Sequence, residues 1–120
     1  LRDARAVPLL VKLLDGGDAA LVREALRALV VLTRMDLGDS PKKWEAWLER
    51  NEDRHRVEWL IDALLSDEEP LRAAAGDELQ RLTQEYYGFH AGSPKKDRER
   101  VHKKYRDWWD STGKKKFGAP

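Results

Sequence analysis

The chain repeats one apolar pattern at a spacing of 50 residues. The matched positions recur every three or four residues, which is the spacing of one helical face. The matched pairs are Val7 and Val57, Leu10 and Leu60, Val11 and Ile61, Leu14 and Leu64, Leu21 and Leu71, Ala25 and Ala75, Leu29 and Leu79, Leu32 and Leu82, Thr33 and Thr83, and Gly38 and Gly88. A helix pair with one apolar face cannot bury that face alone, so stacked neighbours cover each other. The spacing therefore predicts an array of helical hairpins.

Start and stop signals place two such hairpins along the chain. Asp18 is a good N-cap before the second helix, and Pro70 suits the first turn of the fourth. No stretch alternates between apolar and polar residues over a useful length, which disfavours strands. The expected helices span residues 4–15, 19–35, 54–65 and 69–86.

A shorter motif follows each hairpin. Ser-Pro-Lys-Lys occurs at residues 40–43 and 93–96, with serine as the expected N-cap and proline at the first helical position. An aromatic segment comes next, at an offset of 61 instead of 50. The second copy therefore carries about 11 extra residues, the length of about three helical turns. We expect helices at residues 41–51 and 94–111.

Two segments carry a family resemblance. Residues 70–75 followed by Leu79 resemble the second helix of a HEAT repeat, and residues 7–14 resemble a first helix. The whole pattern over residues 4–112 resembles bacterial HEAT-repeat domain proteins. The resemblance implies an all-α fold of two HEAT-like helical-hairpin repeats in an α-solenoid, or superhelix, with an extra Trp-bearing helix after each repeat. It also implies a scaffold or adaptor without catalysis of its own.

Length and composition set the expected domain and compartment. The 120 residues are enough for one core, and 38% of them are charged, which suits a soluble helical protein. There is no cysteine and no apolar run of membrane-spanning length, so we expect a cytoplasmic protein. The predicted domain covers residues 1–112, with repeat one at 4–51 and repeat two at 54–112. Residues 113–120 are expected to form a flexible basic tail.

The sequence lacks the usual marks of an enzyme. It has no phosphate-cradling glycine loop, no nucleophile elbow and no dinucleotide fingerprint. The three histidines, His55, His90 and His102, are scattered and have no convincing metal-ligand spacing. We therefore predict no catalytic residues, no cofactor and no metal site.

The preferred functional interpretation is a protein-interaction scaffold. The second helix of each repeat would present ionic side chains to a protein partner, or to neighbouring repeats and domains of the same polypeptide. The candidate partner-binding residues are Arg23, Arg27, Arg34, Arg81 and Gln84.

An alternative is the binding of nucleic acid or another polyanion. Residues 95–120 carry ten Lys and Arg against four Asp and Glu, whereas residues 1–94 are acidic overall. Phosphate contacts from such a basic helix would be sensitive to salt and blind to base sequence. The same cations could instead pair with the acidic remainder of the chain. The candidate polyanion-binding residues are Lys96, Arg100, Lys103 and Lys104.

Five tryptophans are open to two interpretations. Trp44 with Trp47, and Trp108 with Trp109, could form aromatic shelves for a ligand. They could equally anchor each extra helix to its repeat. Burying one such ring contributes at most roughly 4–6 kcal/mol at about 25 cal/mol/Å². We expect the packing role, and we expect Trp59 to pack between repeats.

The first helix is apolar on more than one side. Leu9 and Leu13 lie off the repeat core, and their counterparts are Trp59 and Ala63. Terminal repeats of stable arrays normally have a polar outer face. The pattern predicts that the chain is a fragment of a longer HEAT-repeat protein, or that this edge docks on another chain.

Overall fold

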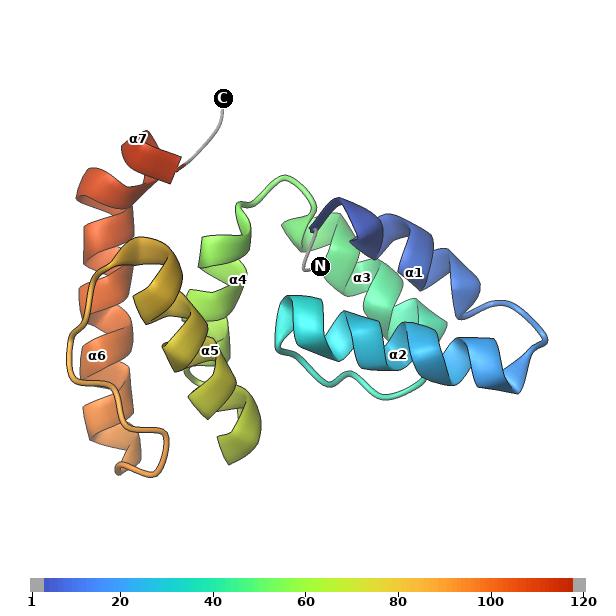
Figure 1. Ribbon diagram of the computed structural model, residues 1–120, viewed down its shortest axis with the longest axis horizontal. Coiled ribbons are helices and arrows are strands. Elements are labelled where there is room, and N and C mark those ends of the chain that lie inside the picture. The colour runs from blue at the N-terminus through green and yellow to red at the C-terminus, as the bar shows by residue number, and fades with distance from the viewer. Residues whose placement is uncertain (1–3, 118–120) are drawn as a thin grey trace. The chain divides into compact units, whose positions relative to one another are not determined.

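The computed structural model describes residues 4–117 (Figure 1). Backbone contacts divide the chain into two units, Leu1–Asp53 and Arg54–Pro120. The first unit contains η1 (Ala4–Ala6), α1 (Val7–Leu13), α2 (Ala19–Thr33) and α3 (Pro41–Asn51). The second contains α4 (Arg56–Ala63), α5 (Glu69–Thr83), α6 (Lys95–Trp108), η2 (Trp109–Gly113) and α7 (Lys114–Phe117). The prediction of a single domain over residues 1–112 stays a prediction.

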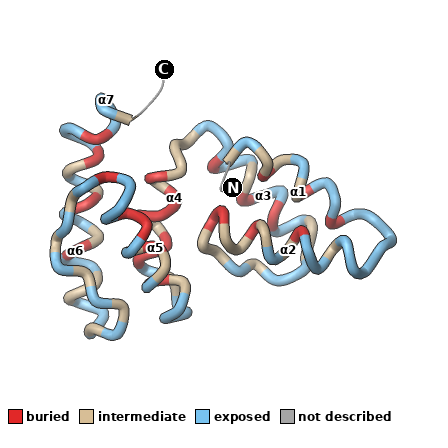
Figure 2. Tube along the Cα trace, in the orientation of Figure 1, coloured by how far each residue is buried: buried red, intermediate tan, exposed pale blue. Residues whose placement is uncertain are grey.

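The two units have the same internal plan. In the first, α1 packs against α2 and α3, and in the second, α4 packs against α5 and α6. No strand occurs between residues 4 and 117, so the predicted all-α helical-repeat fold is confirmed. Figure 2 shows buried residues on the facing sides of these helices. The matched pairs that are buried in both units are Val7 and Val57, Val11 and Ile61, Leu14 and Leu64, Ala25 and Ala75, Leu29 and Leu79, and Thr33 and Thr83.

The second helix of each unit ends at a threonine, and the two threonine hydroxyls make the same hydrogen bonds. The Thr33 hydroxyl donates to the Leu29 carbonyl at 2.7 Å, and the Thr83 hydroxyl donates to the Leu79 carbonyl at 2.6 Å. Each hydroxyl oxygen also accepts from the backbone N–H two residues further on, at 3.1 Å. The buried hydroxyl thereby satisfies backbone groups that the end of a helix leaves without partners.

The chain then leaves both helices through the same backbone conformations. Arg34 and Gln84 take the left-handed conformation, with φ of 54° and 62°. Four residues later Gly38 and Gly88 do so as well, with φ of 73° and 76°. Glycine adopts positive φ without steric cost, which accounts for its recurrence at this turn. The repeat therefore extends beyond the helices into their connections.

The third helix of each unit is anchored by a buried aromatic side chain. Trp44 is fully buried, and its Nε1–H donates to the Gly38 carbonyl at 2.8 Å. Tyr105 is its counterpart, and its hydroxyl donates to the Glu85 carbonyl at 2.9 Å. Trp47 and Trp109 are buried as well, as expected, whereas Trp108 is only partly buried.

The structure corrects the predicted start of the last long helix. Ser40 caps α3 as predicted, accepting from the Lys43 N–H at 3.4 Å. Ser93 does not cap α6, because Pro94 is its N-cap and no side chain accepts a hydrogen bond there. The extra residues of the second aromatic segment lie partly in α6 and partly in the connection before it. Residues 84–94 precede α6, whereas the shorter segment 34–40 precedes α3.

The expected flexible tail is helical in part. Gly113 is buried, and residues 114–117 form α7. The flexibility of the tail stays a prediction. The ring of Phe117 lies 6.1 Å from the ring of Trp108 and 6.3 Å from that of His55. These two ring contacts attach the lysine-rich segment to the second unit. Residues 118–120 lie outside the described part. No helix within that part could cross a membrane.

The outer face of the first helix differs between the units. Leu9 is 66% exposed and Leu13 is 36% exposed on α1. Their counterparts on α4, Trp59 and Ala63, are 3% and 0% exposed. The predicted docking of the α1 face stays a prediction.

Candidate functional site

The segment that joins α5 to α6, residues 84–94, is the candidate site. It runs beside α6 in Figure 1. A cavity of about 260 Å³ lies between this segment and α6, and a second one of about 460 Å³ lies between the segment and α5. We call the first of these the α6 pocket. The following contacts hold the connection in place.

The buried guanidinium of Arg72, on α5, provides the first attachment. Arg72 is 8% exposed. Its Nε and Nη2 donate to the Ala91 carbonyl at 3.0 and 2.8 Å, and its Nη1 donates to the Ser66 carbonyl at 2.9 Å. One side chain thus ties the connection to the turn that precedes α5. Hydrogen bonds from charged donors are stronger than neutral ones, and a buried guanidinium with several acceptors is well satisfied.

Phe89 provides a second attachment, against a glycine inside α5. A Cβ at Gly76 would lie 2.7 Å from Cδ2 of Phe89, so any other residue at this position would force the ring to shift. The corresponding residues of the first unit are Leu26 and Asp39. The bulky apolar residue of this pair therefore lies on the helix in the first unit and on the connection in the second. In the second unit, the ring of Phe89 thus packs the longer connection against Gly76 of α5.

The change in stability caused by Gly76→Ala is expected to have opposite signs with phenylalanine and with alanine at position 89. In the wild-type background, crowding against Phe89 should outweigh the gain of about 1 kcal/mol that alanine has over glycine in a helix, giving a net loss of about 1 kcal/mol. In a Phe89→Ala background, Gly76→Ala should instead stabilise by about 1 kcal/mol. Chemical denaturation of the four proteins measures this coupling. Additive effects would show that the ring does not rest on this glycine.

Two tyrosines hold the start of the connection. The ring of Tyr87 meets the ring of Tyr105 edge-on, with centroids 4.8 Å apart. The Tyr87 hydroxyl donates to the Glu85 carboxylate at 3.1 Å. Burial raises the pKa of the Tyr105 phenol to about 12, and burial followed by the Glu85 contact raises the pKa of Tyr87. Both phenols therefore stay protonated donors at neutral pH.

The α6 pocket combines cationic and aromatic side chains. The Nε of Arg98 donates to the Ser93 carbonyl at 3.0 Å, which joins the helix to the connection. Arg100 lies 3.0 Å from Asp97 in an exposed ion pair. The residues that line the pocket are Tyr87, Gly88, Phe89, His90, Ser93, Asp97, Arg98, Arg100, Val101 and Lys104.

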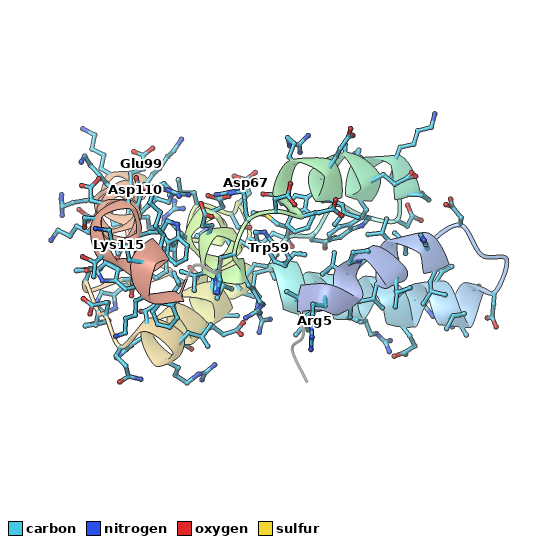
Figure 3. All side chains as sticks on the ribbon, turned by 90° about the horizontal axis from the view of Figure 1, so that it is seen from above. Arg5, Trp59, Asp67, Glu99, Asp110 and Lys115 are labelled. Carbon is cyan, nitrogen blue, oxygen red and sulfur yellow. The ribbon has the colours of Figure 1, made fainter. Side chains whose placement is uncertain are left out.

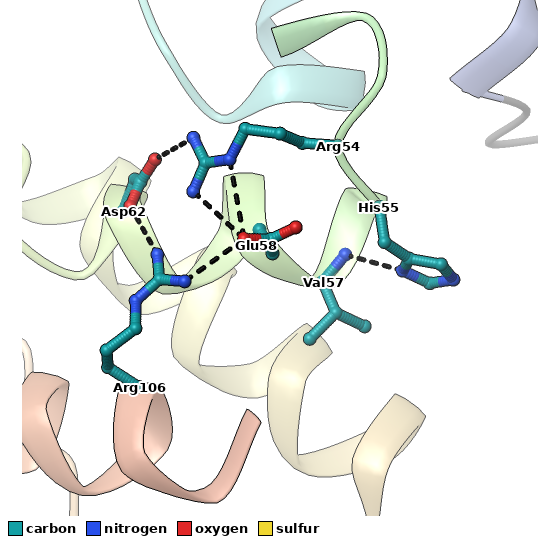
Figure 4. Close-up of polar contacts among 6 residues, drawn as sticks. All are labelled: Arg54, His55, Val57, Glu58, Asp62 and Arg106. Carbon is teal, nitrogen blue, oxygen red and sulfur yellow. Dashed lines mark hydrogen bonds and ion pairs between the residues drawn. The ribbon is translucent and has the colours of Figure 1, made fainter. Parts of the chain in front are cut away.

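A charge network fixes the opposite side of α6 to α4 (Figure 4). Arg106 of α6 donates to Glu58 at 3.1 Å and to Asp62 at 3.3 Å. Arg54 contacts the same two carboxylates, at 3.4 and 2.8 Å. Two guanidinium groups therefore share two partly buried carboxylates, an arrangement that fixes geometry more than it adds stability. This network holds the helix that forms one wall of the pocket.

His55 caps the start of α4 with its imidazole ring. Its Nδ1 accepts a hydrogen bond from the Val57 N–H at 3.1 Å (Figure 4). Its ring lies 5.4 Å from that of Trp109. Burial lowers the pKa of His55 below 6.5, with the charge of Glu58 opposing the shift. Burial also lowers the pKa of His102. A protonated Nδ1 could no longer accept the cap hydrogen bond.

Acidification is expected to destabilise the second unit through His55. Because the pKa of His55 is lower in the folded chain, its contribution to stability is complete above 6.5 and is lost as the pH falls through 6.5 toward the folded value. Asparagine caps helices without titrating. His55→Asn should therefore lose less stability than wild type between about pH 7.5 and about pH 5, as measured by urea denaturation. Equal losses in the two proteins would exclude this role.

The predicted partner-binding residues lie at two kinds of position. Arg23, Arg27 and Arg81 are exposed on α2 and α5, where Arg27 pairs with Glu24 at 2.7 Å. Arg34 and Gln84 instead occupy the left-handed caps, and the Gln84 Nε2 donates to the Arg81 carbonyl at 2.9 Å. Their backbones terminate helices. Their role toward a partner stays a prediction.

The predicted polyanion residues divide among different surroundings. Arg100 and Lys104 line the α6 pocket, whereas Lys103 pairs with Asp107 at 2.7 Å. Lys96 is exposed and outside the pocket lining. Figure 3 shows acidic side chains around α6 and the segment after it, including Glu99 and Asp110.

Sequence reasoning did not identify His90 and Ser93 as residues of this pocket. The insertion before the second Ser-Pro-Lys-Lys motif nevertheless marks their position.

Two further observations bear on other kinds of site. The first unit has a mainly apolar hollow of about 600 Å³ beside α2. Its lining residues are Leu26, Arg27, Val30, Val31, Asp36, Gly38 and Asp39. Within residues 4–117, no three histidine or carboxylate side chains come together in a way that could hold a metal ion.

Comparison with known proteins supports the repeat class. Residues 1–34 are similar to the Armadillo/beta-catenin-like repeat. These residues contain α1 and α2 together with the left-handed cap of α2. No curated protein and no solved structure matches the chain. The repeat match and the three-helix plan that the two units share make the chain an all-α helical-repeat protein. This class is broader than the bacterial HEAT-repeat proteins that its sequence resembles.

Proposed function

We propose that this protein is a non-catalytic scaffold or adaptor that binds protein partners through its helical repeats, in the manner implied by its HEAT-like sequence. The observation that carries the proposal is the Armadillo-type repeat over residues 1–34, because such repeats commonly mediate protein interactions. Repeat proteins bind through surfaces that their regular stacking keeps rigid.

The residues available for this role are ionic side chains on the second helices. Arg23 and Arg27 are exposed on α2, and Arg81 is exposed on α5. Both helices span 15 residues and end in the same threonine cap, so these side chains project from well-supported backbone. Exposed arginine is also enriched among the residues that dominate binding energy at protein interfaces.

Binding of a polyanion through α6 is supported less well. Two of the four candidate cations of α6 have an acidic neighbour on the same helix, because Arg100 lies beside Asp97 and Lys103 lies beside Asp107. Nucleic-acid affinity depends on how many phosphates a protein can neutralise. The two carboxylates lower the net positive charge that a long polyanion would meet along α6, which favours the protein-binding proposal.

Selection against a displayed library of random linear peptides tests the proposal. We expect the wild-type chain to enrich defined peptides, and Arg27→Glu or Arg81→Glu to weaken their binding by about tenfold, or about 1.4 kcal/mol. Lys115→Glu, at an exposed position of α7, is the matched control and should bind as wild type. Absence of enrichment, or an equal loss in the control, would refute the proposal. Tighter binding of a duplex oligonucleotide that weakens steeply with salt would favour the polyanion function instead.

A further inference from the structure

We propose that the α6 pocket binds the phosphate group of a phosphorylated side chain on a protein partner. The inference deepens the proposed protein-binding function and rests on it. The chemistry comes from side chains that the connection 84–94 and α6 bring together around one cavity.

The pocket presents several hydrogen-bond donors of positive charge. Arg100 and Lys104 are four residues apart on α6, so their side chains lie on the same side of the helix. Arg98 lines the pocket as well, and its bond to the Ser93 carbonyl restricts its guanidinium. His90 and Ser93 add polar groups from the connection. Guanidinium and ammonium groups are the usual partners of phosphate in proteins.

The dimensions of the cavity suit one phosphate group and its stem. Its volume of about 260 Å³ is below that of most small-molecule sites. The aromatic residues Tyr87 and Phe89 also line it, beside the charged ones. A nucleic-acid strand would need a long run of cations, whereas this pocket concentrates a few at one point. The observations therefore favour a phosphorylated side chain over a polynucleotide.

The walls of the pocket are held before any ligand arrives. Arg72 fixes the connection at Ala91, and Phe89 rests against Gly76. On the helix side, Arg106 ties α6 to two carboxylates of α4. Binding sites whose groups are already ordered lose less entropy when the ligand binds. The first unit lacks this pocket lining, since its shorter connection, residues 34–40, leads directly into α3.

Asp97 serves as an internal competitor for the ligand. Its carboxylate lies 3.0 Å from the guanidinium of Arg100, and both residues line the pocket. A phosphate carries a charge of roughly −1.5 to −2 and three acceptor oxygens, so it can displace a single carboxylate from arginine. A neutral residue at position 97 should therefore strengthen phosphate binding. Simple surface attraction would predict a similar gain from removing any nearby acidic group.

Nuclear magnetic resonance titration with O-phosphotyrosine, O-phosphoserine and inorganic phosphate tests the site. We expect saturable shifts at the amides of Gly88, His90 and Ser93. Arg100→Gln and Lys104→Gln should each weaken binding by about tenfold. Asp97→Asn should tighten it, whereas Glu99→Gln, which removes an exposed charge from the same helix, should leave it within about twofold. Lys95→Gln, at an exposed position outside the pocket lining, is the matched control for the loss of a cation.

The other possible outcomes would overturn the inference and assign the binding to a different cause. Equal weakening by Lys95→Gln, or shifts that do not saturate, would overturn the inference in favour of diffuse attraction. Binding of inorganic phosphate as tightly as both phosphoamino acids would assign the site to the free ion, and tighter binding of an oligonucleotide would assign it to nucleic acid. The peptide library carries no phosphate, so its enrichment tests the proposed function independently. A chain that enriches peptides but ignores phosphoamino acids would retain the scaffold and lose this site.

Discussion

Replacing Trp44 by alanine is expected to destabilise the first unit by about 4 kcal/mol. The Trp44 ring is fully buried on α3 and meets the ring of Trp47 at a centroid distance of 6.2 Å. Its removal leaves a large cavity and deprives the Gly38 carbonyl of the donor that holds the connection to α3. Hydrogen exchange is the suitable measurement, because it reports the stability of each helix separately. The amides of α1, α2 and α3 should lose protection together.

Two variants distinguish the contributions of packing and hydrogen bonding. Trp44→Phe keeps most of the buried ring but lacks the Nε1–H donor, so it should cost about 1–2 kcal/mol. Leu9→Ala removes a side chain that is 66% exposed on α1 and should cost less than about 0.5 kcal/mol. A loss of less than about 1 kcal/mol in Trp44→Ala would contradict the anchoring role. It would restore the alternative in which the aromatic residues form a ligand shelf.

The sequence predicts the helical framework well, because the framework depends on apolar periodicity. The repeat at 50 residues places α2 and α5 at corresponding positions, and the structure gives both helices the same length. The expected helix at residues 41–51 begins and ends as predicted. Its Ser-Pro start and its apolar face agree, so local and tertiary preferences give one answer.

The second Ser-Pro motif shows where local signals fail. Residues 93 and 94 have the same identities as residues 40 and 41, yet α6 begins at Lys95 without a side-chain cap. The difference lies in a tertiary contact, because Arg72 of α5 donates to the Ala91 carbonyl and so holds the longer connection that precedes α6. A motif of two residues cannot encode attachments made by residues of another helix.

The candidate site was hidden from sequence reasoning for the same reason. Arg72 occupies an ordinary position within a charged helix, and nothing in the pattern pairs it with the carbonyl of Ala91, which lies 19 residues away. Gly76 resembles a weak point of α5, because glycine costs helix stability. The structure shows that it admits the ring of Phe89. Apolar periodicity identifies which faces are buried, but it does not show where an irregular connection passes.

Replacing Arg72 by methionine is expected to destabilise the second unit by about 3 kcal/mol. Methionine retains the apolar stem of the side chain but supplies no donor, so the carbonyls of Ala91 and Ser66 lose their charged partner. Arg72→Lys keeps the charge but cannot reach both carbonyls with the geometry of a guanidinium, and it should lose about half as much. Arg81→Met, on the exposed side of the same helix, should cost less than about 0.5 kcal/mol.

Loss of Arg72 should also release the connection while α5 remains folded. Amide exchange should accelerate at residues 85–93 more than in the middle of α5, because the guanidinium joins the connection to the turn before that helix. The α6 pocket would then lose its ordered wall, and phosphate binding should weaken although no pocket-lining residue has changed. Uniform acceleration throughout the second unit would show that Arg72 supports the whole core. Unchanged exchange at residues 85–93 would show that Phe89 and Tyr87 hold the connection without it.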